Sequence, residues 1–204
     1  MKTKLSLLAL ALAGICTTSQ AAQVDTFDNL STLGWHDQSS LMFLDTVVFE
    51  QGTGSMRVDF TPAASWDDWV TSQDFWSPNQ LNWSSYDELT LWTKVSDLAG
   101  KERIDQITLW DLSGRATRYN LPSPTTTDWG QVVIPFSSFV PDNQPFNFGE
   151  VKAIQIKFTT WDTRAPGTGS VWLDNMQVAA IPEPSIVALI SLGLGSLLVL
   201  RRKA

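Results

Sequence analysis

The chain has few of the side chains on which metal and covalent catalysis usually depend. Among its 204 residues there is one cysteine, Cys16, and one histidine, His36. A zinc site draws its ligands mainly from Cys and His, and a Ser-His-Asp site would have to use His36 although no Gly-x-Ser-x-Gly turn is present. The Gly-rich stretch at 52–55 is followed by neither a lysine nor a helical pattern, so it is a turn and not a phosphate loop. Zinc, serine-hydrolase and nucleotide chemistry are therefore not predicted.

Basic residues are scarce away from the two ends of the chain. The whole sequence has 14 Lys and Arg against 21 Asp and Glu. Five of the basic residues and one of the acidic residues lie in the ends, which leaves 9 basic and 20 acidic residues, a net charge near −11, in residues 23–180. This part cannot neutralise phosphates, so nucleic acid is not a predicted partner. The acidity suits neutral or cationic ligands and divalent metals, or it simply keeps the protein soluble.

Long apolar runs are also missing, except at the two ends. The first run, residues 5–15, follows two lysines and precedes small residues at Ala21 and Ala22. This order is typical of a cleaved signal peptide, so residues 1–22 are predicted to be removed on export. Cys16 would leave with this segment, and residues 23–180 would then fold without a disulfide.

The second apolar run, residues 186–200, is uncharged and is followed by Arg201, Arg202 and Lys203. A basic cluster after an apolar segment stays on the cytoplasmic side of a membrane. Pro182-Glu183-Pro184 comes just before the run. Together these features of residues 181–204 resemble the PEP-CTERM sorting signal of Gram-negative bacteria. That resemblance implies a transmembrane helix, an inner-membrane intermediate, processing by an exosortase, and delivery to the cell surface or the extracellular matrix alongside exopolysaccharide.

Between the ends, apolar residues alternate with polar ones in short runs broken by Gly, Pro, Asn, Asp and Ser, with no helical stripe. This pattern predicts an all-β antiparallel sandwich in one domain over residues 23–180. A hairpin turn is expected at Ser113-Gly114. Strands are expected near Val24–Phe27, Leu41–Phe49, Ser55–Phe60, Val70–Trp76, Glu88–Val95, Gln106–Asp111, Thr117–Leu121, Gln131–Pro135, Lys152–Thr160 and Ser170–Val178.

All ten tryptophans lie in residues 23–180, against two tyrosines in the whole chain. Alternation along three of the expected strands places aliphatic side chains on one face and Trp92, Trp110 and Trp161 on the other. These three rings are therefore predicted to lie outside the core. The alternative, left open by the pattern, is that a loop covers each of them.

The order FDN, GTGSMRV, YDELTLWTKV, WGQVVIPFSSF, VKAIQIKF and GSVWLDNMQV resembles that of jelly-roll carbohydrate-binding modules. The likeness spans most of Val24–Val178 and is strongest to the β-glucan-binding type and to related CIA30-like domains. It implies a jelly-roll fold of the galactose-binding-like kind and a non-catalytic role in binding polysaccharide.

Sugar rings stack on exposed aromatic side chains, and their hydroxyls bond to Asp, Asn, Gln and Arg. Two short segments, at 66–69 and 161–164, combine Trp with Asp, although an acidic turn with packed tryptophans would explain the first equally simply. The predicted ligand-binding residues are Trp66, Asp67, Trp69, Trp92, Trp110, Arg118, Trp161 and Asp162.

The same resemblance implies a structural calcium ion, which takes oxygen ligands. The matching positions are Thr26, the carbonyl of Gly54, and Asp174, with Asp28 and Glu50 nearby. An ordinary strand-end turn is the alternative explanation for Asp174.

These features lead to a hypothesis with two open alternatives. We expect an exported, non-catalytic protein that binds polysaccharide in an extracellular matrix. A structural matrix protein without glycan affinity is the first alternative. A glycan-cleaving enzyme is the second, because the 20 acidic residues do not exclude a pair of catalytic carboxylates, although no motif for one is present.

Overall fold

The computed structural model describes residues 21–37, 41–60, 67–76, 78–98, 102–160 and 169–181, without the side chains of Asp67, Asp68 and Thr160. Residues 21–179 form one compact unit. The sorting residues Pro182, Glu183, Pro184, Arg201 and Arg202, and nearly all of the predicted signal peptide, lie outside the described residues. Within the described part, no helix has the length and apolar character needed to cross a bilayer.

The described chain is built from short and medium strands with two single-turn 3-10 helices, Phe136–Ser138 and Phe148–Glu150. The strands are β1 (Ala21–Asp25), β2 (His36–Asp37), β3 (Met42–Asp45), β4 (Ser55–Asp59), β5 (Asp67–Thr71), β6 (Glu88–Val95), β7 (Glu102–Asp111), β8 (Ala116–Asn120), β9 (Gly130–Pro135), β10 (Val140–Pro141), β11 (Val151–Thr160) and β12 (Ser170–Ala179).

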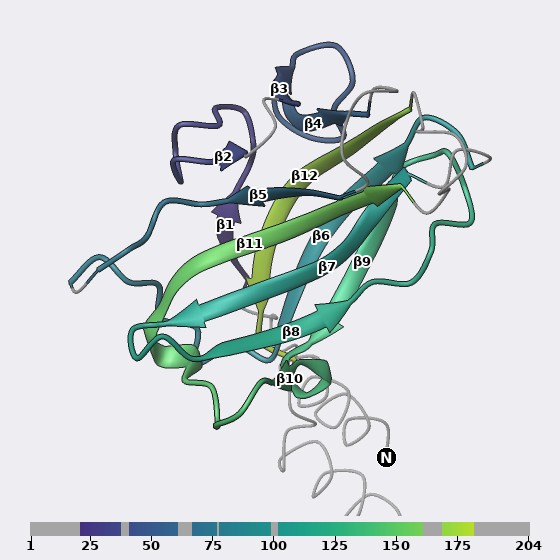
Figure 1. The fold of residues 1–204 in the computed structure, drawn as a ribbon. Helices are drawn as coiled ribbons and strands as arrows, with labels where there is room; N and C mark the ends of the chain where they lie inside the picture. Colours follow the sequence, from purple (N-terminus) through teal and green to yellow (C-terminus); the bar gives the residue numbers. More distant parts are fainter. Residues whose placement is uncertain are drawn as a thin grey trace, which may run out of the picture. The chain divides into compact units, whose positions relative to one another are not determined.

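The strands form two antiparallel sheets that lie one over the other (Figure 1). Sheet A has the order β3-β4-β12-β6-β9, and β1 pairs with β12 at one end of that strand. Sheet B has the order β10-β8-β7-β11-β5-β2. Figure 1 shows β8, β7, β11 and β5 as one layer with β12, β6 and β9 behind it. The predicted antiparallel β-sandwich is therefore confirmed.

The core lies between the sheets and takes alternate residues from the central strands of both. From sheet B it contains Ile154, Ile156 and Phe158 of β11, and from sheet A it contains Val171 and Leu173 of β12, all fully buried. Since side chains alternate along a strand, the residues between these point to the outer faces of the sandwich. The strand phases predicted for β6, β7 and β11 agree with this arrangement.

Of two predictions about the connections between strands, one is confirmed and the other is wrong. The Ser113-Gly114 turn joins β7 to β8, with Gly114 at φ +73°, as the sequence predicts. The strand expected over Leu41–Phe49 ends at Asp45 instead. The reason is local, because the Asp45 carboxylate accepts hydrogen bonds from the backbone N–H groups of Val47 and Val48 at 2.8 and 3.0 Å and so turns the chain out of the sheet.

Candidate functional site

The outer face of sheet B carries two tryptophans at opposite ends of a polar area. Trp69 on β5 lies opposite Lys157 on β11, and the Lys157 ammonium is 5.6 Å from the centre of the Trp69 ring. Trp110 on β7 lies opposite Ala153 of β11. Lys157 and Ala153 are four residues apart on β11, which places the two rings roughly 13 Å apart along the strand direction. Because β5 and β7 lie on opposite sides of β11, the rings are also separated by about 10 Å across the sheet. This distance suits a short oligosaccharide.

Trp110 is the one large side chain in its row across the sheet. Its cross-strand neighbours are Ala153 on β11 and Ala116 on β8. Both alanines are buried, whereas Trp110 is half-buried. The indole therefore stands above small neighbours and offers a flat apolar surface to a ligand.

Between the tryptophans, polar side chains are held by hydrogen bonds to one another. Gln106 donates to Asn120 Oδ1 at 2.7 Å and accepts from Thr108 Oγ1 at 3.2 Å. On the other side of β11, Gln155 donates to Thr71 Oγ1 at 3.3 Å. Side chains fixed in this way lose little entropy when they bind the hydroxyls of a ligand. We call the surface formed by Trp69, Trp110, Gln106, Gln155 and Lys157 the sheet B face.

Charged groups along the sheet B face are paired. Arg118 on β8 donates to Asp142 Oδ2 at 2.7 Å. Asp105 on β7 lies 3.5 Å from Lys157 and 2.9 Å from Arg103. These pairs leave no strong net charge from the five residues, which suits an uncharged ligand.

The structure brings together three of the eight predicted ligand-binding side chains, Trp69, Trp110 and Arg118, on sheet B. Asp67 begins β5, and its backbone pairs with Thr159 near the end of β11. The segments that hold the other predicted residues, Trp66, Trp161 and Asp162, lie outside the described residues.

Trp92 is separated from the others. It is half-buried and out of phase with the core, as predicted, but β6 belongs to sheet A. Its cross-strand neighbours are Asp174 and Gln131, also on sheet A. Strand phase tells an outward side chain from an inward one, but it does not tell which of the two sheets the strand joins.

One aromatic side chain beside the sheet B face was not predicted as a ligand contact. Trp76 is 58% exposed, the most exposed tryptophan in the described residues. It follows β5 and stacks on Lys152, whose ammonium is 4.5 Å from the ring centre, and Lys152 precedes the Ala153 that faces Trp110. The sequence signal was its position just before Ser77-Pro78, a dipeptide that favours a turn.

The predicted calcium residues belong to neighbouring strands of sheet A, because Thr26 follows β1 and Gly54 precedes β4, and both strands pair with β12, which contains Asp174. The carboxylate of Asp174 is fully buried, and its Oδ2 accepts from the backbone N–H groups of Glu50 and Gln51 at 2.7 and 2.9 Å. Its Oδ1 has no hydrogen-bond partner in the described part of the chain. Asp28 accepts from the backbone N–H of Gly54 at 2.9 Å. Segments that are far apart in sequence thus gather oxygen atoms around the buried Asp174.

The electrostatics around Asp174 and Asp25 disfavour their charged forms. Burial raises the pKa of Asp174, and the nearby charge of Asp28 raises it further, against the hydrogen bonds that lower it. Burial likewise raises the pKa of Asp25, with a smaller contribution from Asp28. A cation would relieve these repulsions and satisfy the unpaired oxygen. Thr26 is exposed and follows Asp25 in the chain. Among the described residues, no group of three or more His, Cys, Asp and Glu side chains is placed to hold a metal ion.

The backbone around the cluster is also unusual. Phe27 and Asn175, which flank Asp28 and Asp174, have φ of +58° and +46°. Non-glycine residues adopt this conformation rarely and at a cost, often beside functional sites. Gly52 has φ +73°, and a Cβ atom there would lie 2.4 Å from Asp28 Oδ1. The turn that approaches Asp28 therefore requires glycine.

Comparison with solved structures finds this fold among carbohydrate-binding modules. The family 11 module of a cellulosomal cellulase of Clostridium thermocellum is 18% identical, with a TM-score of 0.55 over 81% of this chain and 98% of that one. The family 30 module of a cellulosomal cellulase from the same organism is 18% identical, with a TM-score of 0.55 over 80% and 99%. An agarase is 10% identical, with a TM-score of 0.54 over 79% of this chain but 25% of its own. At these identities the likeness concerns the fold.

No curated protein sequence matches the chain significantly. The sequence does match a family model described as carbohydrate binding domain 30, over residues 23–180. That match covers most of the chain and includes every strand from β2 to β12. The chain therefore belongs to the carbohydrate binding domain 30 family.

Proposed function

We propose that this protein is an exported, non-catalytic module that binds a neutral polysaccharide of the β-glucan type on the sheet B face. The observation that carries the proposal is the placement of two tryptophans on one face. Trp69 lies in a row across the sheet with Lys157 and Gln106, and Trp110 stands beside two alanines in a row farther along β11. Two aromatic surfaces separated by fixed polar groups match a chain of sugar rings, each with apolar faces and a rim of hydroxyls.

Family membership supports binding, and the state of the carboxylates supports the absence of catalysis. Glycoside hydrolysis needs an unpaired carboxylate and a protonated carboxylic acid on either side of the scissile bond. On the sheet B face, Asp105 and Asp142 are instead engaged with Arg and Lys side chains at 2.7–3.5 Å. The agarase that shares the fold is about four times longer than the matched part, so its likeness supplies no catalytic residues to this chain.

The β-glucan class comes from a structural relative. A family 11 module of Clostridium thermocellum with the same fold, 16% identical and with a TM-score of 0.55, is described in complex with a β-1,3-1,4-mixed-linked tetrasaccharide. This oligosaccharide is therefore the first ligand to test. A structural matrix protein without glycan affinity is the competing function.

We further propose that calcium binds beside Asp174 and holds the Glu50–Gly54 turn against the end of sheet A. The buried unpaired Oδ1 of Asp174 is the supporting observation. The ion would fix the turn between β3 and β4 in place. It has no direct part in the binding on sheet B.

Export and sorting rest on the sequence of the two ends. The PEP tripeptide at 182–184, the apolar run and the terminal basic residues support processing by an exosortase after insertion in the inner membrane. The mature module would then lie at the surface of a Gram-negative cell or outside it.

Affinity electrophoresis against a panel of soluble polysaccharides tests the function. We expect mixed-linkage β-glucan to retard the wild-type protein, and Trp69→Ala to reduce the retardation. Retardation by no polysaccharide in the panel would support the structural matrix function instead.

A further inference from the structure

A second polar and aromatic site lies on the outer face of sheet A, on the other side of the sandwich from the sheet B face. Arg57 on β4 stands between Phe43 on β3 and Trp172 on β12, in one row across three strands. The residues on either side of Arg57, Met56 and Val58, are fully buried in the core. The row therefore points outward.

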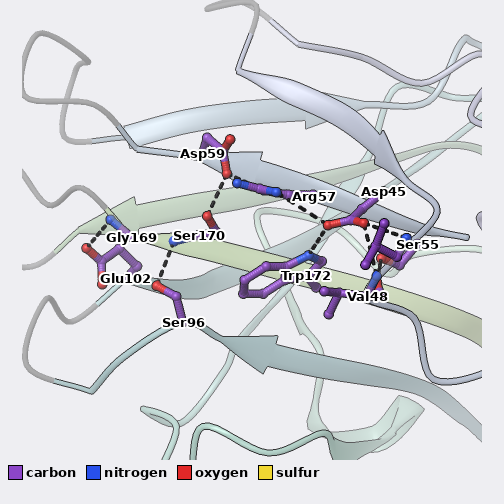
Figure 2. Close-up of polar contacts among 11 residues, drawn as sticks. Asp45, Val48, Ser55, Arg57, Asp59, Ser96, Glu102, Gly169, Ser170 and Trp172 are labelled. Atoms are coloured by element: carbon purple, nitrogen blue, oxygen red, sulfur yellow. Dashed lines mark hydrogen bonds and ion pairs between the residues drawn. The ribbon is translucent and has the colours of Figure 1, made fainter.

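Arg57 is held in one orientation on this face (Figure 2). Its Nε donates to Asp59 Oδ1 at 2.5 Å, and its Nη1 lies 3.4 Å from Asp45 Oδ2. The guanidinium carbon is 5.5 Å from the centre of the Trp172 ring. Two ion pairs and a stacking contact leave the guanidinium little freedom.

The two carboxylates are themselves fixed by other groups. Asp45 Oδ2 accepts from the indole N–H of Trp172 at 2.9 Å, and Asp59 Oδ1 accepts from Ser170 Oγ at 2.6 Å (Figure 2). Burial alone would raise the pKa of Asp45, but the hydrogen bonds from Trp172 and the backbone, with the charge of Arg57, lower it overall. Asp45 is therefore charged at neutral pH, and the site is rigid before any ligand arrives.

The fixed Arg57 and Asp59 side chains present one hydrogen-bond donor and one acceptor next to each other. Within the described residues, neither Arg57 Nη2 nor Asp59 Oδ2 has a protein partner, and the two side chains are 36% and 29% exposed. The ring of Phe43, next to Arg57 on the edge strand, is 48% exposed. A cavity of about 380 Å³ is lined by Phe43, Leu44, Asp45, Thr46, Val47, Arg57 and Asp59, a volume within the range of small-ligand sites.

We infer that this cavity is a second sugar-binding site, in which a neutral sugar ring stacks on Phe43 while two neighbouring hydroxyls bond to Arg57 and Asp59. A donor next to an acceptor matches a pair of hydroxyls, each of which can donate and accept. One cation against two carboxylates disfavours an anionic sugar or a phosphate. The inference takes the class of ligand from the proposed function, but its residues are independent of the sheet B face.

Two sites on opposite faces of one sandwich would allow this protein to cross-link a polysaccharide. A single chain of this protein would bind two polysaccharide strands at once and link them. Linking raises the strength of attachment by multivalency without any new contact within either site.

Isothermal titration of the full chain in mild detergent with the β-1,3-1,4-linked tetrasaccharide tests the inference. We expect two binding events for the wild-type protein. In Phe43→Ala we expect only the event at the sheet B face, because binding at the cavity should be weakened at least tenfold, roughly. Phe43→Trp should keep both events, because it keeps the ring. The matched control is Val133→Ala, since Val133 is 47% exposed on the outer face of the same sheet and does not line the cavity.

The outcomes separate the two sites. Trp110→Ala should remove the other binding event and leave the one that depends on Phe43. A single event in the wild-type protein, or two unchanged events in Phe43→Ala, would overturn the second site while leaving the sheet B face intact. If Phe43→Ala alters self-association in sedimentation and leaves binding unchanged, the exposed apolar segment is a protein interface and the inference fails. No binding of the tetrasaccharide at either face would refute both sites.

Discussion

The sharpest test of the sheet B face compares two tryptophans that the sequence alone does not distinguish. Trp110 and Trp92 both lie in long central strands, both are out of phase with the core, and both are half-buried. Trp110 stands on sheet B and Trp92 on sheet A. Changing each to alanine removes the same atoms from opposite faces of the sandwich.

The expected loss of stability is similar for the two variants. Removing a fully buried Trp such as Trp83 costs about 3–5 kcal/mol, and a half-buried ring should cost roughly half as much, or about 2 kcal/mol. For a domain of this size, that corresponds to a fall in melting temperature of roughly 4–8 °C. Both variants should therefore stay folded at room temperature.

The expected loss of binding differs between them. A stacked ring of a binding hot spot contributes on the order of 2 kcal/mol, so Trp110→Ala should bind mixed-linkage β-glucan roughly thirtyfold more weakly at the sheet B face. Trp92→Ala should bind like the wild-type protein. Calorimetry of unfolding and affinity electrophoresis together measure both quantities. Equal binding by Trp110→Ala and the wild-type protein, or equal weakening in both variants, would refute the assignment of the site to sheet B.

Three further predictions concern calcium, pH and sorting. Chelator should lower the melting temperature of the wild-type protein and should barely affect Asp174→Ala. The free energy of unfolding that is lost would be about 2.7 kcal/mol for an ion present at a hundred times its dissociation constant. Identical melting of the wild-type protein with and without chelator would exclude the ion. With the ion removed by chelator, burial raises the pKa of Asp174 in the folded protein above its ordinary value of 3.8. The protonated carboxyl therefore stabilises the fold fully below pH 3.8, and this stabilisation is lost as the pH rises through the folded-state pKa. Denaturant unfolding should accordingly show the wild-type protein gaining stability relative to Asp174→Asn as pH falls, and a pH-independent difference would contradict this. Replacing Pro182-Glu183-Pro184 by three alanines should leave a longer, membrane-held precursor on an immunoblot, whereas normal size and yield at the surface would rule out the sorting signal.

Alternation alone was enough to predict the sandwich and the inward face of its long strands. In β11 the large core residues Ile154, Ile156 and Phe158 fall at every second position, so the period shows in the sequence. The residue at which β3 ends could not be predicted from the alternation. Val47, Val48 and Phe49 look like a continuing strand, and only the hydrogen bonds to the Asp45 carboxylate end it.

The sites depend on pairing between distant strands, which a single sequence does not show. Trp69 and Trp110 meet the same strand, β11, from its two sides, a neighbourhood set by sheet order. The register between β12 and β6 shifts directly after Asp174, between Asp174 and Gln177. Bulges of this kind follow from the packing of the whole sheet and leave no local sequence signal.

The position of β12 has a consequence for the order in which the protein can fold. It follows all the other described strands in the sequence, yet it lies between β4 and β6 and also pairs with β1, so that Ala21 faces Ala179. Until residue 179 has left the ribosome, three earlier strands wait for their common partner. Pairing over such separations is slow, and unpaired strand edges are open to aggregation and proteolysis in the interval. A nascent chain of this protein is therefore most vulnerable when the strands before β12 have emerged from the ribosome but β12 has not, because sheet A cannot yet close.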